Sequence, residues 1–373
     1  MDTIKTKHEI IIGAAQNMHQ IEDKSIALVV TSPPYPMIEM WDDILAKQNP
    51  QITNAFANND GSLAFEFMHK ELDKIWNEVE RVLMPGGFAC INIGDATRTI
   101  NNEFALYPNH SRIITKFLNL GFNNLPNIIW RKQTNAPNKF MGSGMLPSGA
   151  YVTLEHEWIL IFRKGGKRKF KSDEEKLDRK ESSFFWEERN IWFSDLWDLK
   201  GTKQKIENSE TRKRSAAYPF ELPYRLINMY SLKGDTILDP FLGTGTTSIA
   251  AISSQRNSIG YDIDPNFLDI ILDNIETTPI NFYNNYIQNR IEQHRQFLLE
   301  RNADSTKDEI KHFNKNLNMQ VMTTQEVEIK LSFVSELIRE DEKIMASYDN
   351  IKPENYTIPT NKKSKTGQTT LTL

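Results

Sequence analysis

The fold of this chain is decided by the stretch Thr236-Ile237-Leu238-Asp239-Pro240-Phe241-Leu242-Gly243-Thr244-Gly245-Thr246-Thr247. An apolar run comes first, two glycines follow, and a segment with helical character extends from Thr246 to Ser254. We therefore expect a strand, a tight loop and a helix, in that order. Glycines in such a loop let the backbone approach a ligand closely, and the helix N-terminus exposes amide donors. The stretch predicts a ligand site at the carboxyl end of a buried strand.

An acidic residue follows this loop at the spacing of a nucleoside site. The next apolar run, 258–261, ends in Asp262, whose carboxylate can bind the two hydroxyls of a ribose. A P-loop would need Lys where Thr246 stands, and a dinucleotide site prefers a third glycine where Ser248 stands. A purely structural turn is the remaining alternative, disfavoured because strand, helix and acid match in spacing. The nucleoside site is predicted to comprise Asp239, Pro240, Phe241, Gly243, Thr244, Gly245, Thr246, Thr247 and Asp262.

A second loop with chemical character follows the apolar run 26–30. It reads Thr31-Ser32-Pro33-Pro34-Tyr35. Two consecutive prolines fix the backbone and remove its amide donors, so the loop presents carbonyl acceptors between a hydroxyl and an aromatic ring. Such a loop can hold a planar group that bears an NH2, although a structural turn is an equal alternative for the tetrapeptide alone. Its place at the carboxyl end of a strand, where α/β folds bind ligands, favours the functional interpretation.

The rest of the chain alternates short apolar runs with amphipathic segments. The runs that are too short for helices are 8–12, 88–93, 127–130 and 157–162. The segments with helical spacing are 72–83, 111–120 and 221–230. This alternation is typical of an α/β fold with a mostly parallel sheet. An irregular polar stretch is expected over 42–62, and helical spacing returns over 282–348.

Composition limits the class of protein. The 373 residues are 39% hydrophobic and 25% charged, ordinary values for a globular protein. No apolar run approaches the length of a membrane helix, and the N-terminus lacks the apolar run of a secretory signal. The single cysteine, Cys90, excludes an internal disulfide and a Cys-rich zinc site, so we expect no metal and a reducing cytoplasm.

Charge is distributed unevenly along the chain. The net charge is −4, yet residues 163–214 hold 16 Lys or Arg against 11 Asp or Glu. The first nine residues of that segment contain six basic side chains and no acid. A basic patch on a neutral body is typical of a surface that contacts phosphates, and a solvated loop is an equal alternative. The predicted DNA-binding residues are Arg163, Lys164, Lys167, Arg168, Lys169 and Lys171.

Together these motifs resemble the β-class DNA amino-methyltransferases, a circularly permuted version of the S-adenosylmethionine-dependent methyltransferase fold. In that family the catalytic tetrapeptide precedes the cofactor loop, as Ser32–Tyr35 precedes Gly243–Gly245 here. Protein-glutamine methyltransferases have the opposite order. The resemblance covers about residues 8–275. It includes, in the family's order, the segments Leu83–Gly87, Gly94-Asp95, Gly121–Lys132, Glu155–Lys164 and Tyr218–Pro223.

The resemblance implies a Rossmann-like permuted sheet, S-adenosyl-L-methionine as cofactor and double-stranded DNA as substrate. It adds Asp95, Pro219 and Phe220 to the expected cofactor site. Ser32, Pro33, Pro34 and Tyr35 become the catalytic loop, in which Ser32 and the Pro33 carbonyl accept hydrogen bonds from the target amine and Tyr35 stacks on the flipped base. Family members with Ser at the first position usually methylate cytosine N4, whereas Asp or Asn there is usual for adenine N6.

One feature departs from the family pattern. After its first strand the family often carries Gly-Asp, and the acid serves the cofactor's adenine. This chain has Gly13-Ala14-Ala15, so backbone groups or Gln16 are expected to make that contact. Cys90 lies in an apolar run with no neighbouring proline motif, and we interpret it as a small core residue rather than as the nucleophile of a C5-methyltransferase.

The sequence thus predicts five parts. They are a catalytic half (1–164), a target-recognition insert (165–214), an S-adenosylmethionine-binding half (215–280), a helical extension (281–358) and a disordered tail (359–373). The predicted activity is cytosine-N4 methylation of duplex DNA. By family analogy, the enzyme serves a restriction–modification system with a cognate endonuclease, or acts as a solitary methylase. Alternatives are adenine N6 methylation, a catalytically dead DNA-binding protein, and an RNA or small-molecule methyltransferase. No membrane partner is expected, and the protein is a monomer or dimer.

Overall fold

A computed structural model describes residues 4–132, 141–142, 144–201 and 218–351. The expected tail, 359–373, and residues 202–214 of the expected insert lie outside the described residues. In the described part, no helix has the length and apolar character needed to cross a membrane.

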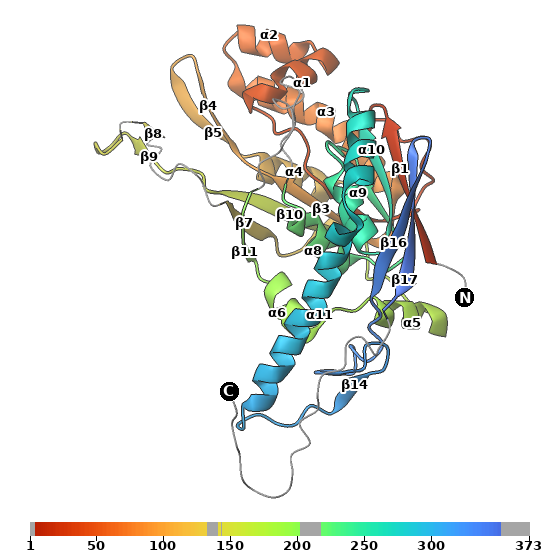
Figure 1. Ribbon diagram of the computed structural model, residues 1–373. Helices are drawn as coiled ribbons and strands as arrows, with labels where there is room; N and C mark the ends of the chain where they lie inside the picture. Colours follow the sequence, from red (N-terminus) through yellow and green to blue (C-terminus); the bar gives the residue numbers. More distant parts are fainter. Residues whose placement is uncertain (1–3, 133–140, 143, 202–217, 352–373) are drawn as a thin grey trace, which may run out of the picture.

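A large twisted sheet forms the centre of the molecule (Figure 1). Its strand order is β11 (Leu196–Leu199), β7 (Ile128–Lys132), β10 (His156–Lys164), β3 (Leu83–Ile93), β2 (Ile26–Thr31), β12 (Thr236–Asp239), β13 (Asn257–Asp262), β1 (Ile4–Ile12), β17 (Lys343–Asn350) and β16 (Ser332–Glu340), with β6 (Phe122–Asn124) paired to β10. The strands from β3 through β2, β12 and β13 to β1 are parallel, whereas β10 and β17 run antiparallel to their neighbours. The carboxyl ends of the parallel strands therefore meet at one edge.

Helices cover both faces of the sheet, which confirms the expected α/β architecture. Strand β2 shows why: Val29 faces α3 and α4, while Leu28 and Val30 face α8 and α9. The helices are η1 (Glu39–Trp41), α1 (Asp42–Gln48), α2 (Gln51–Ala57), α3 (Gly61–Val82), α4 (Asn109–Asn119), α5 (Asp173–Glu181), α6 (Trp186–Trp192), α8 (Glu221–Tyr230), α9 (Thr246–Ser253), α10 (Phe267–Thr277) and α11 (Ile280–Ala303). Short hairpins are formed by β4 (Ala96–Ile100) with β5 (Glu103–Tyr107), β8 (Met141–Gly142) with β9 (Ala150–Tyr151), and β14 (His312–Asn314) with β15 (Met319–Val321).

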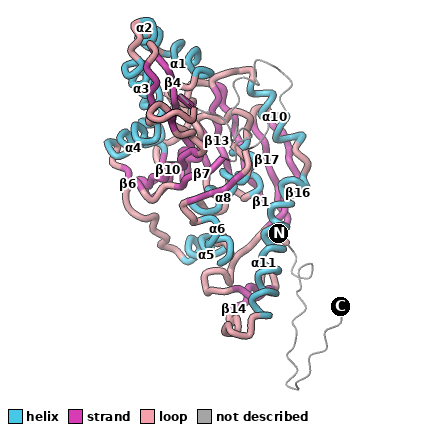
Figure 2. Tube along the Cα trace, turned by 90° about the vertical axis from the view of Figure 1, so that its left-hand side faces the viewer, coloured by secondary structure: helices cyan, strands magenta, loops and turns pink. Residues whose placement is uncertain are grey.

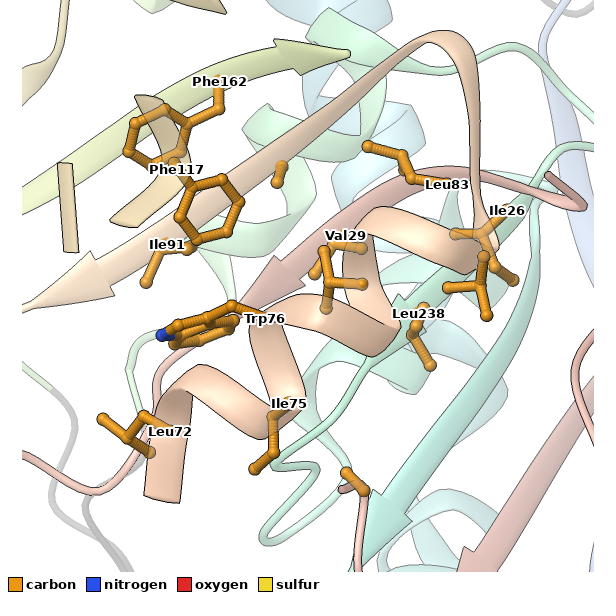
Figure 3. Packing of buried hydrophobic residues seen from close by; sticks show 14 of the residues in the cluster. Ile26, Val29, Leu72, Ile75, Trp76, Leu83, Ile91, Phe117, Phe162 and Leu238 are labelled. Atoms are coloured by element: carbon orange, nitrogen blue, oxygen red, sulfur yellow. The ribbon is translucent and has the colours of Figure 1, made fainter. Parts of the chain in front are cut away.

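The core on the α3 side is packed around an aromatic stack (Figure 3). Phe117 of α4 stacks on Phe162 of β10 with ring centroids 4.3 Å apart, and Trp76 of α3 lies 5.5 Å from Phe117. All three side chains are fully buried, and each full burial stabilises the fold by roughly 2–3 kcal/mol. This packing fixes β2 and β3, and with them the loops at their carboxyl ends.

The structure corrects three expectations about organisation. The stretch 42–62 is not irregular, because it forms α1, α2 and the first residues of α3. Among the described residues of the extension, only α11 is helical; beyond it, β16 and β17 form a hairpin that joins the central sheet through β1. Figure 2 shows α11 and β14 at the opposite end of the molecule from α1 and α2.

The expected insert is also built into the core over its described residues. Strand β11 pairs with β7 at the edge of the sheet, and Trp197 and Trp192 are buried in the core on the α8 side. Phe185 stacks on His294 of α11 with centroids 4.0 Å apart. The segment was predicted to recognise the DNA target; these aromatic side chains pack in the interior because the segment closes the sheet edge and supports α11.

Candidate active site

A cavity of about 280 Å³ opens at the carboxyl edge of the sheet, at the lower end of the size range of small-molecule sites. The residues that line it follow four parallel strands: β1, β2, β12 and β13. Both predicted loops contribute. Of the predicted site residues, the cavity is lined by Ser32, Pro33, Pro34, Tyr35, Pro240, Phe241, Gly243, Thr244, Thr246 and Asp262.

The glycine loop adopts the predicted strand–loop–helix arrangement. Gly243 and Gly245 have φ values of +55° and +86°, in the left-handed region that side chains disfavour. A Cβ on Gly245 would also lie 3.0 Å from Cγ2 of Ile271. Gly245 itself does not line the cavity; it allows the turn that begins α9 and keeps the loop against α10.

Asp262 ends β13 and faces the cavity as predicted. Its carboxylate accepts hydrogen bonds from the backbone N–H groups of Gly243 (3.1 Å) and Asp264 (2.9 Å). Burial raises the pKa of Asp262 to about 6, against the lowering effect of those two hydrogen bonds. A half-buried carboxylate beside Gly243, which also lines the cavity, can accept hydrogen bonds from the hydroxyls of a ribose. The residues present therefore fit a bound nucleoside.

Asp239 has a different place from the one predicted. It does not line the cavity and is almost fully buried. Its carboxylate accepts hydrogen bonds from Thr31 (2.6 Å), from Thr247 and Tyr218, and from the backbone N–H of Phe241 (3.0 Å). Asp239 thus connects the beginnings of the two loops by hydrogen bonds. Thr247 belongs to this hydrogen-bond network rather than to the cavity wall.

The Ser32–Tyr35 loop ends in a polar network that sequence reasoning missed. The Tyr35 hydroxyl donates to Glu157 Oε2 (2.8 Å), and Ser32 Oγ lies 3.1 Å from Tyr35 Oη. Asn92 of β3 donates through Nδ2 to Tyr35 Oη (2.8 Å) and to Glu157 Oε2 (2.7 Å). Lys132 of β7 forms an ion pair with Glu157 Oε1. Burial, and then the adjacent Glu157 carboxylate, raises the pKa of Tyr35 well above its ordinary value, so the phenol stays protonated.

Two further residues hold this loop in place. A Cβ on Gly94 would lie 3.0 Å from the Tyr35 ring, so glycine at the end of β3 lets the ring approach. Asn109 is fully buried and donates through Nδ2 to the carbonyls of Pro36 (3.1 Å) and Gly94 (2.9 Å). A polar residue within the apolar run 88–93 and an acid at the start of the run 157–162 were the signals available for Asn92 and Glu157.

Three residues expected at the cofactor site lie elsewhere. Asp95 accepts hydrogen bonds from Nδ1 (2.7 Å) and the backbone N–H (3.1 Å) of His110, so it fixes the start of α4 and does not line the cavity. Pro219 and Phe220 also lie outside the cavity wall, and Phe220 packs against Tyr286 with centroids 4.2 Å apart. Tyr218, the residue before them, lines the cavity instead.

The predicted DNA-binding run lies at the opposite edge of the sheet. Because β10 is antiparallel to β3, its last residues pair with Phe88 and Ala89, away from the carboxyl end of β3. Lys164 forms an ion pair with Glu80 (2.8 Å) and Arg168 with Asp235 (2.7 Å), whereas Lys167, Lys169 and Lys171 are exposed there. The run thus lies away from the cavity, and DNA binding by these six residues stays a prediction.

The rest of the cavity wall comes from residues 13–16 and from residues that follow the Ser32–Tyr35 loop in the chain. Gly13, Ala14, Ala15 and Gln16 line the cavity after β1, and Gln16 Nε2 donates to Gln48 Oε1 of α1 (2.6 Å). Apolar side chains complete this wall: Ile38, Met40, Trp41 and Ile44. They come from η1 and α1, in and beside the stretch expected to be irregular.

Comparison with known proteins decides the family. The model of the DNA methylase family, which comprises N6- and N4-methyltransferases, matches residues 26–273, and these include both loops of the cavity. The chain belongs to this family. Methyl transfer to DNA with S-adenosylmethionine as cofactor is thereby confirmed at the level of the family.

Two relatives of this methylase are similar over nearly their whole length. The type II methyltransferase M.MthZI of Methanothermobacter thermautotrophicus is 53% identical over 88% of this chain and 91% of its own. The type II methyltransferase M.MjaI of Methanocaldococcus jannaschii is 51% identical over 73% of this chain and 92% of its own.

Solved structures share the fold. A putative DNA modification methylase from Thermus thermophilus, solved as a complex with S-adenosyl-L-methionine, has a TM-score of 0.54 and 31% identity, covering 72% of this methylase and 94% of that chain. The cytosine-N4-specific PvuII DNA methyltransferase has a TM-score of 0.52 over 76% of this chain and 94% of its own. At 16% identity, the latter is similar in fold alone.

Proposed function

We propose that this methylase transfers a methyl group to N4 of cytosine at a specific site in duplex DNA. The observation that carries the proposal is Ser32 at the first position of the tetrapeptide, with its hydroxyl at the cavity wall. Ser at that position is usual in the cytosine-N4 members of the β-class enzymes that the sequence resembles. Adenine N6 is the alternative outcome.

The part of the cavity wall formed by Ser32–Tyr35, here called the base wall, acts by positioning the target amine. The lone pair of an exocyclic amine is conjugated into the ring, so the amine is a weak nucleophile. Ser32 Oγ and the Pro33 carbonyl accept hydrogen bonds from the NH2, which localises the lone pair and directs it toward the methyl donor. The Tyr35 ring stacks on the flipped base, a contact worth about 1–3 kcal/mol. Because Glu157 and Asn92 anchor the Tyr35 hydroxyl, the ring is in place before the base arrives.

The part of the cavity wall formed by residues 13–16, the Gly243 loop and Asp262, here called the cofactor wall, holds the cofactor. S-adenosylmethionine, when bound, supplies an electrophilic methyl group on sulfur. Asp262 accepts hydrogen bonds from the ribose hydroxyls, and the backbone of Gly243 and Thr244 lies against the nucleoside. Gln16 and the backbone at Ala14 and Ala15 contact the adenine, since no acid follows β1. Met40, Trp41 and Ile44 shield this part of the cavity from water.

The biological setting follows from the relatives. Both archaeal relatives are named type II methyltransferases. We infer that this methylase protects its own DNA against a cognate endonuclease in a restriction–modification system. The endonuclease shares the recognition sequence and needs no physical contact with the methylase.

Product analysis tests the proposal. The protein is incubated with tritiated S-adenosylmethionine and mixed-sequence duplex DNA, which is then digested to nucleosides and chromatographed. We expect the label in N4-methylcytidine. Label in N6-methyladenine would keep the mechanism of the base wall and overturn the choice of base. Absence of label in DNA, with cofactor binding intact by calorimetry, would overturn the proposed function.

A further inference from the structure

A continuous path of polar atoms leads from the cavity to a buried carboxylate. Its members are Ser32 Oγ, Tyr35 Oη and Glu157 Oε2, separated by 3.1 Å and 2.8 Å. The tyrosine hydroxyl has a single proton, and that proton is donated to Glu157. Ser32 Oγ must therefore donate its own proton to Tyr35 Oη. Asn92 Nδ2 donates a long hydrogen bond to Ser32 Oγ (3.4 Å), and the remaining lone pair of Ser32 is available as an acceptor for an amine.

Three donors surround the Glu157 carboxylate. Lys132 of β7 is paired with Oε1, and Asn92 of β3 and Tyr35 both donate to Oε2. Just before β10, the strand that holds Glu157, Glu155 is paired at long range with Arg131. The side chain of Glu157 is about one-tenth exposed, and the path from Ser32 connects it to the cavity.

We propose that Glu157 is the final acceptor of the proton that the target amine loses, at the end of a relay through Ser32 and Tyr35. The inference rests on the proposed role of the Ser32–Tyr35 loop. When the amine nitrogen takes the methyl group, its lone pair forms the N–C bond and the electrons of the broken C–S bond stay on sulfur. The nitrogen then carries one excess proton. That proton moves to Ser32 Oγ, the serine proton moves to Tyr35 Oη, and the tyrosine proton moves to Glu157. Charge and atoms balance: the sulfonium and the carboxylate are both neutralised.

Glu157 has an alternative role as a purely structural anchor for Tyr35. Replacing the Glu157 carboxylate with an amide distinguishes the two roles. Glu157→Gln keeps a side chain of the same size, with an oxygen that accepts from Tyr35, but it cannot take up a proton at the end of the relay. Tyr35→Phe keeps the stacking ring and interrupts the path. Glu155→Gln, a change to a partly exposed side chain two residues away on the chain, is the matched control.

The test is single-turnover methyl transfer, measured by rapid quench with tritiated S-adenosylmethionine and duplex DNA in H2O and in D2O. We expect the E157Q rate to fall about 100-fold, within the usual range for a lost general base, with cofactor affinity unchanged. The wild-type rate should fall in D2O because protons move along the relay, and E157Q should show a smaller solvent isotope effect. Y35F should lose a similar factor, and the E157Q/Y35F double variant should be no slower than either single variant.

Contrary results are distinguishable. A wild-type rate and solvent isotope effect in E157Q, or multiplicative losses in the double variant, would overturn the relay and leave the proposed function intact. If the wild-type enzyme labels no amino nitrogen in DNA, the proposed function and the relay both fail. Should E157Q fail to fold, as judged by its thermal transition, the solvent isotope effect of Y35F decides: retention of the wild-type value would overturn the relay.

Discussion

The two walls of the cavity differ in how their polar groups are satisfied. On the base wall, the hydroxyls of Ser32 and Tyr35 are bonded to each other and to side chains beneath them. On the cofactor wall, the bonds run mostly between a carboxylate and backbone amides of the same loops, as at Asp262. Both walls share one support, Asp239. Its carboxylate accepts hydrogen bonds from the Thr31 hydroxyl of one loop and from the backbone N–H of Phe241 of the other. Side-chain changes should therefore disturb the base wall selectively, whereas loss of Asp239 should disturb both.

The strongest disruption is expected from removal of the shared support. Asp239→Ala leaves the hydroxyls of Thr31, Thr247 and Tyr218 and the N–H of Phe241 without their buried acceptor. We expect unfolding free energy to fall by about 4 kcal/mol, with loss of cofactor binding and of methylation. Urea denaturation and calorimetry measure both. Asp23→Ala, which removes an exposed partner of Arg81, is the control and should cost less than about 1 kcal/mol. Equal stability of the two variants would refute a common support.

The base wall should fail separately from the cofactor wall. Ser32→Ala removes an acceptor for the amine, and we expect kcat to fall about 100- to 1,000-fold, the usual effect of losing one preorganised hydrogen bond at a reacting group. The dissociation constant of S-adenosylmethionine should stay within twofold of the wild type. Steady-state kinetics and calorimetry give the two values, with the exposed Ser111→Ala as control. Parallel loss of cofactor binding would show that the walls are not independent.

The cofactor wall should respond to pH through Asp262. Its pKa in the free protein is raised to about 6, so the carboxyl is ionised above that pH and protonated below it. A ribose needs the ionised acceptor, and binding should therefore weaken as pH falls through 6. We expect cofactor affinity to drop about tenfold between pH 7.5 and pH 5. Calorimetric titration of Asp262→Asn should give weaker binding with a flat profile. A wild-type profile without this step would remove Asp262 from the ribose site.

The smallest predicted effect is a change in DNA affinity, and it compares basic residues at the two edges of the sheet. Lys167 and Lys169 lie at the edge away from the cavity, whereas Arg131 is exposed near the carboxyl end of β7. We expect the double change of both lysines to Ala to alter DNA affinity less than twofold, and Arg131→Ala to reduce it about threefold with a shallower salt dependence. Fluorescence anisotropy at several salt concentrations measures both. The reverse ranking would restore the basic run as the DNA-contacting surface.

Local sequence was a good guide wherever one segment makes its own structure. The residues 236–247 dictated a strand, a left-handed turn and a helix, because apolar runs, glycines and helical spacing act over a few residues. The same holds for 26–35, where two prolines fix the loop. In contrast, the stretch 42–62 looks polar and irregular, yet it is helical because Ile52 and Leu45 find a hydrophobic cluster formed by α3 and β5.

The sequence by itself determined the order of the two loops, their place at strand ends and the family to which the chain belongs. Tertiary structure alone decided which polar groups meet. Thr31 and Asp239 are 208 residues apart in the chain, and Tyr35 and Glu157 are 122 apart. Strand order and direction bring such pairs together, and they also carry the basic run to the far edge through the antiparallel β10. Residue types report the chemistry a side chain can perform; the pairing of distant strands sets the partner that lets it act.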